Sequence, residues 1–299
     1  MWRRHHVDVP VGVVDVGSNT VRVLVSDHGR TLLSERAMLR LGADIELHGE
    51  IPAEKLETTA DLVGRFVADA RKAGADPIEV LIASPGRQAA NGADLAAEIA
   101  GRAGCPTRIL SAVEEGHLAF VGAVTNAGVP AGRTVGVVDV GGGSAQVVVG
   151  TRKNGPVWTR SIDIGSQRLT SRMLSQDPPG SAAVGAARAE VDRHLAGFDP
   201  PQPRTTLAIG GSARALKRIV GGRLGRAELD SLLVLLADTP TGELVERHGI
   251  AADRVRTLPG GAVILSEIQR VLGTPLRVQR GGLREGALLS LAGERALAA

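Results

Sequence analysis

Aromatic and sulfur-containing side chains are scarce in this chain of 299 residues, which has three Phe, two Trp, no Tyr and one cysteine. A protein with so few aromatic rings offers poor stacking platforms for single-stranded nucleic acid. The formal net charge is only +3, so the chain also lacks a general basic surface for DNA. The single cysteine excludes an internal disulfide, and no Cys/His cluster has the spacing of a zinc site.

Long apolar runs are missing as well. No stretch approaches about 18 uninterrupted apolar residues, so we predict no membrane span. The segment Met1–His6 is basic, but the apolar stretch after it is short and contains Asp8 and Asp15, which is unlike a signal peptide. We therefore expect a cytoplasmic protein with no nucleic-acid or membrane partner. Cys105, a small residue before Pro106, is expected to be structural rather than a nucleophile.

What the chain does have is a repeat. The hexapeptide GVVDVG occurs at Gly12–Gly17 and again at Gly136–Gly141. Each copy predicts a short buried strand of β-branched residues that delivers one aspartate, Asp15 or Asp139, beside a tight turn. An aspartate inside an apolar strand is costly to desolvate unless it binds a metal or accepts hydrogen bonds. The repeat therefore suggests two related half-domains that face one polyanionic ligand and its cation.

The hydrophobic pattern and the Gly/Pro punctuation divide both halves in the same way. In the first half we predict strands over residues 11–16, 21–26, 31–39, 79–83 and 107–110, with helices over 52–73, 93–103 and 112–125. In the second half we predict strands over 134–140, 145–150, 157–164 and 205–209. We predict one helix over 166–174 and a second that passes through Glu190 and ends at about Leu195. The remainder from 210 is predicted to be mostly helical. This pattern predicts two α/β domains with mixed sheets, residues 1–126 and 127–299, with a cleft between them as the ligand site. The last helix is free to pack back on the first domain.

Two glycine-containing loops follow the repeated aspartates. Glycine leaves backbone N–H groups unhindered and tolerates positive φ, which suits a loop that wraps phosphate. Either loop alone fits a plain hairpin turn, but the two together, each after a buried aspartate, favour phosphate binding. A third candidate opens a predicted helix, where the dipole attracts anions, although close packing explains it equally well. The residues of the three loops are Gly17, Ser18 and Asn19; Gly141, Gly142, Gly143 and Ser144; and Gly210, Gly211 and Ser212.

Three charged residues are candidates for chemistry. Ser111 and Glu114 have the spacing of a capping box, so Glu114 is expected to bond back to the Ser111 N–H. Glu115 has no such local role and lies at the start of the same helix, which makes it a candidate acid–base group. Arg87 follows a predicted strand and could clamp a phosphate, with an exposed loop arginine as the alternative.

Together these features resemble the exopolyphosphatase / guanosine pentaphosphate phosphohydrolase (Ppx/GppA) family, which belongs to the superfamily of actin, sugar kinases and Hsp70. The resemblance lies in DVGSNTVRVLV at 15–25, ASPGRQAAN at 83–91, LSAVEEGHLAFVGA at 110–123 and DVGGGSAQ at 139–146, and more weakly in IGSQRL, AIGGSARAL and GLREGAL. The first and fourth segments fit the whole superfamily, whereas the paired glutamates and GLREG narrow it. The resemblance implies two ribonuclease H-like, actin-like α/β domains whose mixed sheets flank a central cleft.

The resemblance also implies roles for the candidate residues. Glu115 would be the general base that polarises water for in-line attack on a terminal phosphoryl group. Asp15 and Asp139 would hold Mg²⁺, or alternatively Mn²⁺, and Gln146 would occupy a further metal position. The three glycine loops would cradle phosphates, and Arg87 would bind the terminal phosphate.

The chain departs from the family pattern in three places. Gln146 stands where the family has an acid, Ser84–Pro85–Gly86 replaces a Thr-Ser-Ala-like run, and Gly116–His117 replaces Ala-Arg. By this resemblance we expect the extra C-terminal helical domains of long members to be absent, and we therefore expect a preference for short polyphosphate chains or nucleotides.

Several functions remain open at this point. The leading hypothesis is Mg²⁺-dependent release of orthophosphate from inorganic polyphosphate. Hydrolysis of pppGpp to ppGpp, and a catalytically weak sensor of polyphosphate or guanosine tetraphosphate, are the alternatives. A sugar kinase or actin-like ATPase would fit the two aspartate loops, but the Glu115 segment and GLREG argue against it. A homodimer is also left open.

Overall fold

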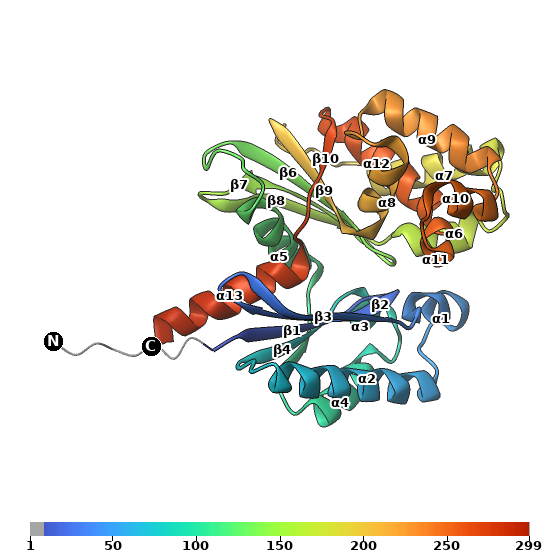
Figure 1. Cartoon of the computed structure of the whole chain (residues 1–299). Helices are drawn as coiled ribbons and strands as arrows, with labels where there is room; N and C mark the ends of the chain where they lie inside the picture. The colour runs from blue at the N-terminus through green and yellow to red at the C-terminus, as the bar shows by residue number, and fades with distance from the viewer. Residues whose placement is uncertain (1–8, 299) are drawn as a thin grey trace. The chain divides into compact units, whose positions relative to one another are not determined.

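The chain divides into two compact units in a computed structural model that describes residues 9–298, with side chains described to residue 293 (Figure 1). Met1–His6 and Asp8, used in the argument against a signal peptide, lie outside the described residues. One unit runs to Leu110 and includes Ala287–Ala299, and the other is Ser111–Gly286. The sequence-based boundary after residue 126 therefore falls inside the second unit, at the end of helix α5 (Ala112–Thr125).

The first unit is built on a five-stranded mixed sheet. The first three strands are antiparallel: β1 (Val11–Val16), β2 (Thr20–Asp27) and β3 (Arg30–Met38). Two further strands extend the sheet on the other side of β1 and are parallel to it: β4 (Ile78–Ile82) and β5 (Thr107–Ile109). The strand order is β3-β2-β1-β4-β5. Its helices are α1 (Leu41–His48), α2 (Ala53–Lys72), α3 (Ser84–Gln88) and α4 (Gly92–Ala103). Valine-rich β1 and β2 form strands because β-branched side chains fit the buried pleated surface.

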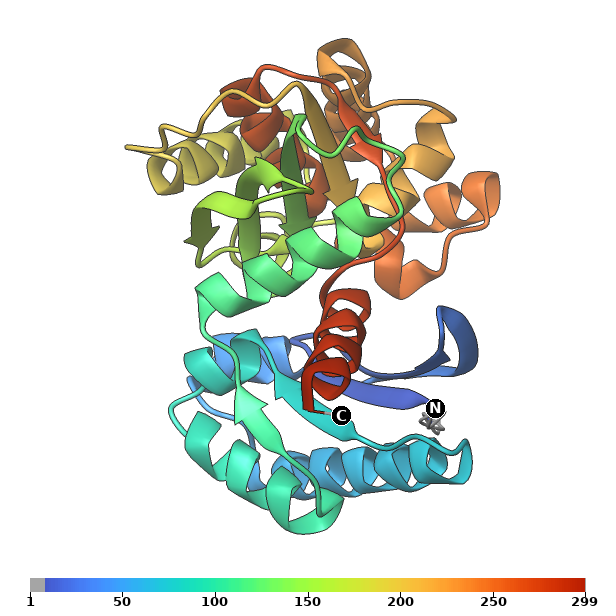
Figure 2. The ribbon, with the colours of Figure 1, turned by 90° about the vertical axis from the view of Figure 1, so that its left-hand side faces the viewer.

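Helices α2 and α4 pack together on one face of this sheet (Figure 2). Val63, Phe66 and Ala70 lie on one side of α2 at helical spacing, and all three are fully buried. Burying a side chain such as that of Phe66 contributes roughly 1.5–3 kcal/mol. The other face of the sheet carries Asp15. Helix α13 (Leu283–Ala298), which belongs to this unit from Ala287 onward, runs along that face (Figures 1 and 2).

The second unit repeats the sheet topology of the first. Its antiparallel strands are β6 (Thr134–Val140), β7 (Ala145–Thr151) and β8 (Gly155–Ile162), and its parallel additions are β9 (Thr205–Ile209) and β10 (Leu276–Val278). The order is β8-β7-β6-β9-β10, the counterpart of the first sheet. This duplicated ribonuclease H-like arrangement confirms the fold class that the repeated hexapeptide and the family resemblance predicted.

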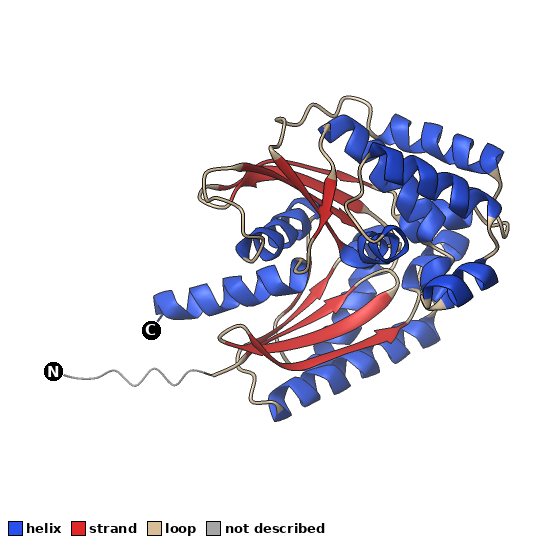
Figure 3. Ribbon diagram, turned by 45° about the horizontal axis from the view of Figure 1, so that its top comes forward, coloured by secondary structure: helices blue, strands red, loops and turns tan. Residues whose placement is uncertain are grey.

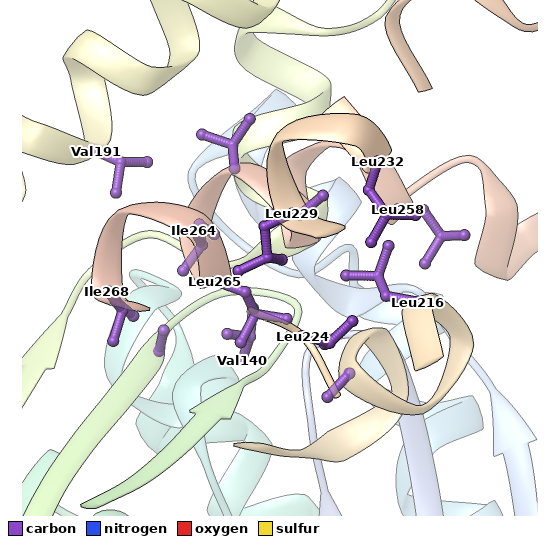
Figure 4. Close-up of a cluster of buried hydrophobic side chains, with 14 of the residues drawn as sticks. Val140, Val191, Leu216, Leu224, Leu229, Leu232, Leu258, Ile264, Leu265 and Ile268 are labelled. Carbon is purple, nitrogen blue, oxygen red and sulfur yellow. The ribbon is translucent and has the colours of Figure 1, made fainter. Parts of the chain in front are cut away.

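Helices cover both faces of the second sheet. Helix α5 packs on one face through Phe120 and Ala123. On the other face gather α6 (Ser166–Met173), α7 (Ser181–His194), α8 (Gly210–Val220), α9 (Arg226–Asp238), α10 (Thr241–His248), α11 (Ala252–Val255) and α12 (Leu258–Leu272) (Figure 3). Helix α12 is buried on nearly every side, with Ile264, Leu265 and Ile268 packed among the neighbouring helices and strand β6 (Figure 4). Within residues 9–298 no helix is both long and apolar enough to cross a bilayer.

Most predicted elements match the structure to within one or two residues, but three were missed. Helix α1 follows Arg40 in the left-handed conformation and has no side-chain cap, so its start carries no sequence signal. Helix α3 contains Pro85 and Gly86, which are typical of turns. Strand β10 has only three residues and exists through its pairing with β9.

Candidate active site

Each repeated aspartate is followed by the same tight turn. The Gly17 N–H donates to the Thr20 carbonyl at 3.1 Å, and the Gly141 N–H donates to the Ser144 carbonyl at 3.0 Å. The turns predicted from the hexapeptide are therefore confirmed in both halves. Because the amides of Gly17 and Gly141 close these turns, a phosphate cradle here would have to use the amides that follow them.

In the first unit, the turn is tied to helix α3 through a hydroxyl pair. Ser18 is 3% exposed, and its Oγ lies 2.6 Å from the Ser84 Oγ. The Ser18 carbonyl also accepts from the Gly42 N–H at 2.7 Å. Ser18 therefore fixes the position of the turn relative to the start of α3.

The alternative considered for Arg87, an exposed arginine in a loop, is wrong, whereas its role as a phosphate clamp stays a prediction. Ser84–Gln88 forms helix α3, where a Cβ on Gly86 would lie 2.8 Å from Ile109 Cγ1, so glycine is needed for close packing on the sheet. Arg87 is half-buried, and its Nη1 donates to the Leu110 carbonyl at 2.7 Å. One of the five guanidinium N–H donors thus fastens α3 to the chain just before Ser111.

Arg22 is a candidate that sequence reasoning missed. It pairs directly with Asp15 in the β1–β2 register, so both side chains lie on one face of the sheet. Its Nε donates to the Thr20 Oγ1 at 3.1 Å, which holds the guanidinium beside the turn. The available sequence signal was a charged residue at an alternating position within a valine-rich strand.

In the second unit, a polar row crosses three strands. Asp139 of β6 pairs with Gln146 of β7, which pairs with Ser161 of β8. Gln146 is 1% exposed, and its Nε2 donates to the Ser144 Oγ at 3.0 Å and to the Ser161 Oγ at 3.4 Å. The Gln146 amide is thus held in a neutral hydrogen-bonded network directly opposite Asp139.

Helix α5 begins with the predicted capping box. The Glu114 N–H donates to the Ser111 Oγ at 3.2 Å, and the Ser111 N–H donates to the Glu114 Oε2 at 2.9 Å. The structural role expected for Glu114 is confirmed. Its neighbour Glu115 is half-buried and donates its N–H to the Ser111 carbonyl in the first helical hydrogen bond.

The start of α5 rests on the polar end of the second sheet. A Cβ on Gly116 would lie 3.1 Å from Val148 Cγ2 and 3.7 Å from the Gln146 Cβ, so only a very small residue fits there. The adjacent Glu115 therefore lies on the turn of α5 nearest Gln146. His117 reaches the same sheet, with its Nε2 at 3.2 Å from the Thr159 Oγ1.

Two peptide carbonyls of the Gly141–Ser144 loop are bound by helix α6. The Gly141 carbonyl accepts from the N–H and the Oγ of Ser166, and the Gly142 carbonyl accepts from the N–H groups of Gln167 and Arg168. In a trans peptide the C=O points opposite to the N–H of the next residue. The N–H groups of Gly142 and Gly143 therefore point away from α6. The hydrogen bonds from α6 to the two carbonyls fix the loop in this orientation.

The third glycine loop begins helix α8 next to Asp139. Gly210 has φ +88°, and a Cβ there would lie 2.8 Å from the Asp139 Oδ1. A Cβ on Gly211 would lie 2.7 Å from the Cζ of Arg254, an arginine of α11 that no sequence motif had singled out. Ser212 is fully buried, and its Oγ has no hydrogen-bond partner among the described residues. The glycines allow close approach of an acidic and a basic side chain to the start of α8.

The carboxylates of Asp15 and Asp139 suit a cation that is bound partly by the protein and partly by the phosphates of a substrate. The described residues contain no group of three or more His, Cys, Asp or Glu side chains arranged for a metal. Mg²⁺ commonly binds one or two carboxylates together with substrate phosphates, and Asp139 with the amide oxygen of Gln146 matches that kind of donor set. Asp15 offers one carboxylate in the first unit. That Asp15 and Asp139 share one cation stays a prediction.

Comparison of the sequence with known protein families identifies the family of this chain. The Ppx/GppA phosphatase family matches residues 21–295. The chain belongs to the Ppx/GppA phosphatase family. Together with the named relatives below, membership makes it a hydrolase of phosphoanhydride bonds.

Curated relatives are similar along most of the chain. Exopolyphosphatase 1 of Mycobacterium leprae is 28% identical over 93% of this chain and 88% of its own length. Exopolyphosphatase 2 of Mycobacterium tuberculosis is 28% identical over 95% and 98%, respectively. The guanosine-5'-triphosphate,3'-diphosphate pyrophosphatase of Aeromonas hydrophila is 25% identical over 94% of this chain and 59% of its own.

Solved structures share the fold. An exopolyphosphatase from Cytophaga hutchinsonii superposes with a TM-score of 0.83 at 22% identity, covering 94% of this chain and 97% of its own. The Aquifex aeolicus PPX-GPPA enzyme superposes with a TM-score of 0.79 at 23% identity, covering 94% and 99%. The chain therefore has the same fold as these two proteins.

Proposed function

We propose that this protein releases terminal orthophosphate from inorganic polyphosphate, preferably short chains, by Mg²⁺-assisted attack of water. The observation that carries the proposal is the placement of Glu115 within the second unit. It lies at the start of α5, on the turn packed against Gln146, whose direct cross-strand partner is Asp139. The mycobacterial exopolyphosphatases, which match this chain over nearly its full length, support polyphosphate as the substrate.

In the proposed reaction, Glu115 accepts a proton as a water oxygen attacks the terminal phosphorus. The bond from that phosphorus to the bridging oxygen breaks, the shortened chain leaves with the bridging oxygen, and orthophosphate is released. Bound Mg²⁺ would neutralise charge on the leaving phosphate. The Gly142 and Gly143 amides, turned away from α6, would donate to phosphate oxygens, and Arg87 would hold the terminal phosphate.

A panel of substrates tests this function. Purified protein is given tripolyphosphate, long-chain polyphosphate or pppGpp, each with and without Mg²⁺, and released orthophosphate is measured. We expect Mg²⁺-dependent release, fastest from the short chain. If no orthophosphate is released from any of the three substrates at saturating Mg²⁺, the enzymatic proposal is wrong.

Two alternatives are separated by the same panel. Release from pppGpp alone would favour the guanosine pentaphosphate reaction, which the similarity to the A. hydrophila pyrophosphatase supports. Tight binding of polyphosphate or ppGpp without turnover would favour a sensor. The neutral Gln146 motivates that second alternative, because hard cations prefer anionic oxygen ligands.

A further inference from the structure

A groove runs between helices α7 and α9 of the second unit (Figure 1). The Gly180 N–H at the start of α7 donates to the Ala237 carbonyl near the end of α9 at 2.9 Å. Because residues of both helices line the same groove, the two helices run antiparallel along it. The groove holds a cavity of about 370 Å³, which is in the size range of small-molecule sites. None of its lining residues belongs to the three glycine loops or to the start of α5.

The groove is apolar at one end and charged at the other. Val234 and Ala237 line it near the junction with Gly180, and Val234 is 63% exposed. At a rise of about 1.5 Å per residue, Arg188 lies about 12 Å from that junction along α7. On α9, Asp230 and Arg226 lie about 10 Å and about 16 Å from it. Arg188 is therefore level with the stretch of α9 that carries these two charges.

A buried carboxylate holds Arg188 in place. The Nε of Arg188 donates to the Glu267 Oε1 at 2.7 Å, and Glu267 of α12 is 1% exposed. The Glu267 Oε2 accepts from the Nε of Arg270 at 2.9 Å, and Arg270 has a second carboxylate partner in Asp192. The Nη atoms of Arg188 have no hydrogen-bond partner among the residues whose side chains are described. The guanidinium is thus fixed through Nε, while its Nη atoms remain as a pair of donors.

The balance of charge favours a ligand with a single negative charge. Arg226 donates from Nε to the Asp230 Oδ2 at 2.9 Å, so these two charges offset each other. Arg188 shares the one charge of Glu267 with another arginine, so its own charge is only partly balanced. A planar carboxylate matches the paired Nη donors of a guanidinium. A second negative charge on the ligand would be repelled by Asp230.

We propose that this groove binds an aliphatic monocarboxylate. The carboxylate accepts from the Nη donors of Arg188 and Arg226, and the chain lies along Val184, Val234 and Ala237. Burial of apolar surface contributes about 25 cal/mol per Å², and covering the exposed Val234 side chain supplies part of it. The site is separate from the candidate active site and does not depend on the proposed function.

An NMR titration of the full chain with hexanoate tests the proposal. Backbone amide shifts should move saturably and should map to α7 and α9. Hexanamide keeps the size of the ligand but removes its charge, and acetate keeps the charge but removes the chain. Each should bind at least about tenfold more weakly than hexanoate, because one loses the charged hydrogen bonds and the other the apolar burial.

Three variants locate the site. Arg188→Lys keeps a positive charge for Glu267 but removes the planar fork, so hexanoate should bind about tenfold more weakly. Val234→Glu adds a like charge at an exposed position and should weaken binding about fivefold, which keeps the test valid if Arg188→Lys impairs folding. The control is Arg193→Ala, which removes an exposed arginine of α7 outside the groove and should change affinity less than about twofold.

Four outcomes would overturn the assignment. They are the absence of saturable shifts in α7 and α9, equal binding of hexanamide and hexanoate, tighter binding of hexyl phosphate than of hexanoate, and unchanged hexanoate affinity in Val234→Glu. Because every readout is binding, the result is independent of whether the protein releases orthophosphate.

Discussion

Replacing Gln146 by glutamate would place a second carboxylate directly opposite Asp139 in a nearly dry position. Directly paired side chains have Cβ atoms about 5 Å apart. At that separation and an effective dielectric constant of about 20, two like unit charges repel by about 3 kcal/mol. The hydroxyls of Ser144 and Ser161, which now accept from the amide, could rotate and donate to the new carboxylate. We therefore expect a net loss of roughly 1–3 kcal/mol in the free energy of unfolding at pH 8 without Mg²⁺.

The sign of the pH dependence follows from the repulsion. The pKa of the introduced carboxyl should be raised in the folded state above its unfolded value of about 4.3. The penalty is then absent below the unfolded pKa and grows as pH rises through the raised folded pKa. The difference in stability between Gln146→Glu and the parent should accordingly be smaller at pH 5 than at pH 8.

Urea unfolding at both pH values, with and without Mg²⁺, measures this effect. Mg²⁺ should recover most of the loss at pH 8, and Gln146→Glu should reach half-maximal activity at a lower Mg²⁺ concentration than the parent. Val157→Glu, at an exposed position on β8, is the matched control and should leave the Mg²⁺ dependence unchanged. If Gln146→Glu alters neither the stability gained from Mg²⁺ nor the Mg²⁺ dependence of the rate, position 146 is not a metal position.

Three further predictions concern residues around the site. Arg87→Ala should raise KM for polyphosphate roughly tenfold, and unchanged kinetics would mean that Arg87 has a structural role, to which its bond to the Leu110 carbonyl belongs. Gly286→Ala would place a Cβ onto the Leu118 carbonyl oxygen of α5, so it should cost about 1–3 kcal/mol in urea unfolding and lower kcat, whereas Gly293→Ala, with open space around it, should do neither. Burial raises the pKa of the Cys105 thiol, so iodoacetamide should alkylate it more slowly in the folded protein at pH 7 than in urea; equal rates would contradict that environment.

Local patterns in the sequence were enough to predict most of the fold. Runs of β-branched residues bounded by glycine predicted β1, β6 and β9, because such runs fit buried strands and glycine ends them. The Ser111–Glu114 spacing predicted two hydrogen bonds of the α5 start, both of which are present. The duplicated hexapeptide predicted the duplicated sheet.

The missing parts of the site depend on contacts between distant segments. Arg22 becomes a neighbour of Asp15 only through the β1–β2 register, and Arg254 reaches Gly211 only when α11 packs beside α8. The loop expected around Arg87 is a helix because Gly86 and Gly92 allow close packing that turn propensities do not reveal. Helix starts, strand pairs and close approaches of this kind are set by tertiary structure.

Single-turnover release of orthophosphate by Glu115→Gln tests the central claim, that Glu115 is the base that activates water. Glutamine keeps the size and hydrogen-bonding capacity of the side chain but cannot accept the proton. Turnover should fall by about 10²–10⁴-fold, while equilibrium binding of polyphosphate stays within about twofold of the parent. Glu114→Gln is the adjacent control, which disturbs the capping box by up to about 1 kcal/mol and should keep near-parental turnover. Near-parental turnover in Glu115→Gln, with binding intact, would contradict the account.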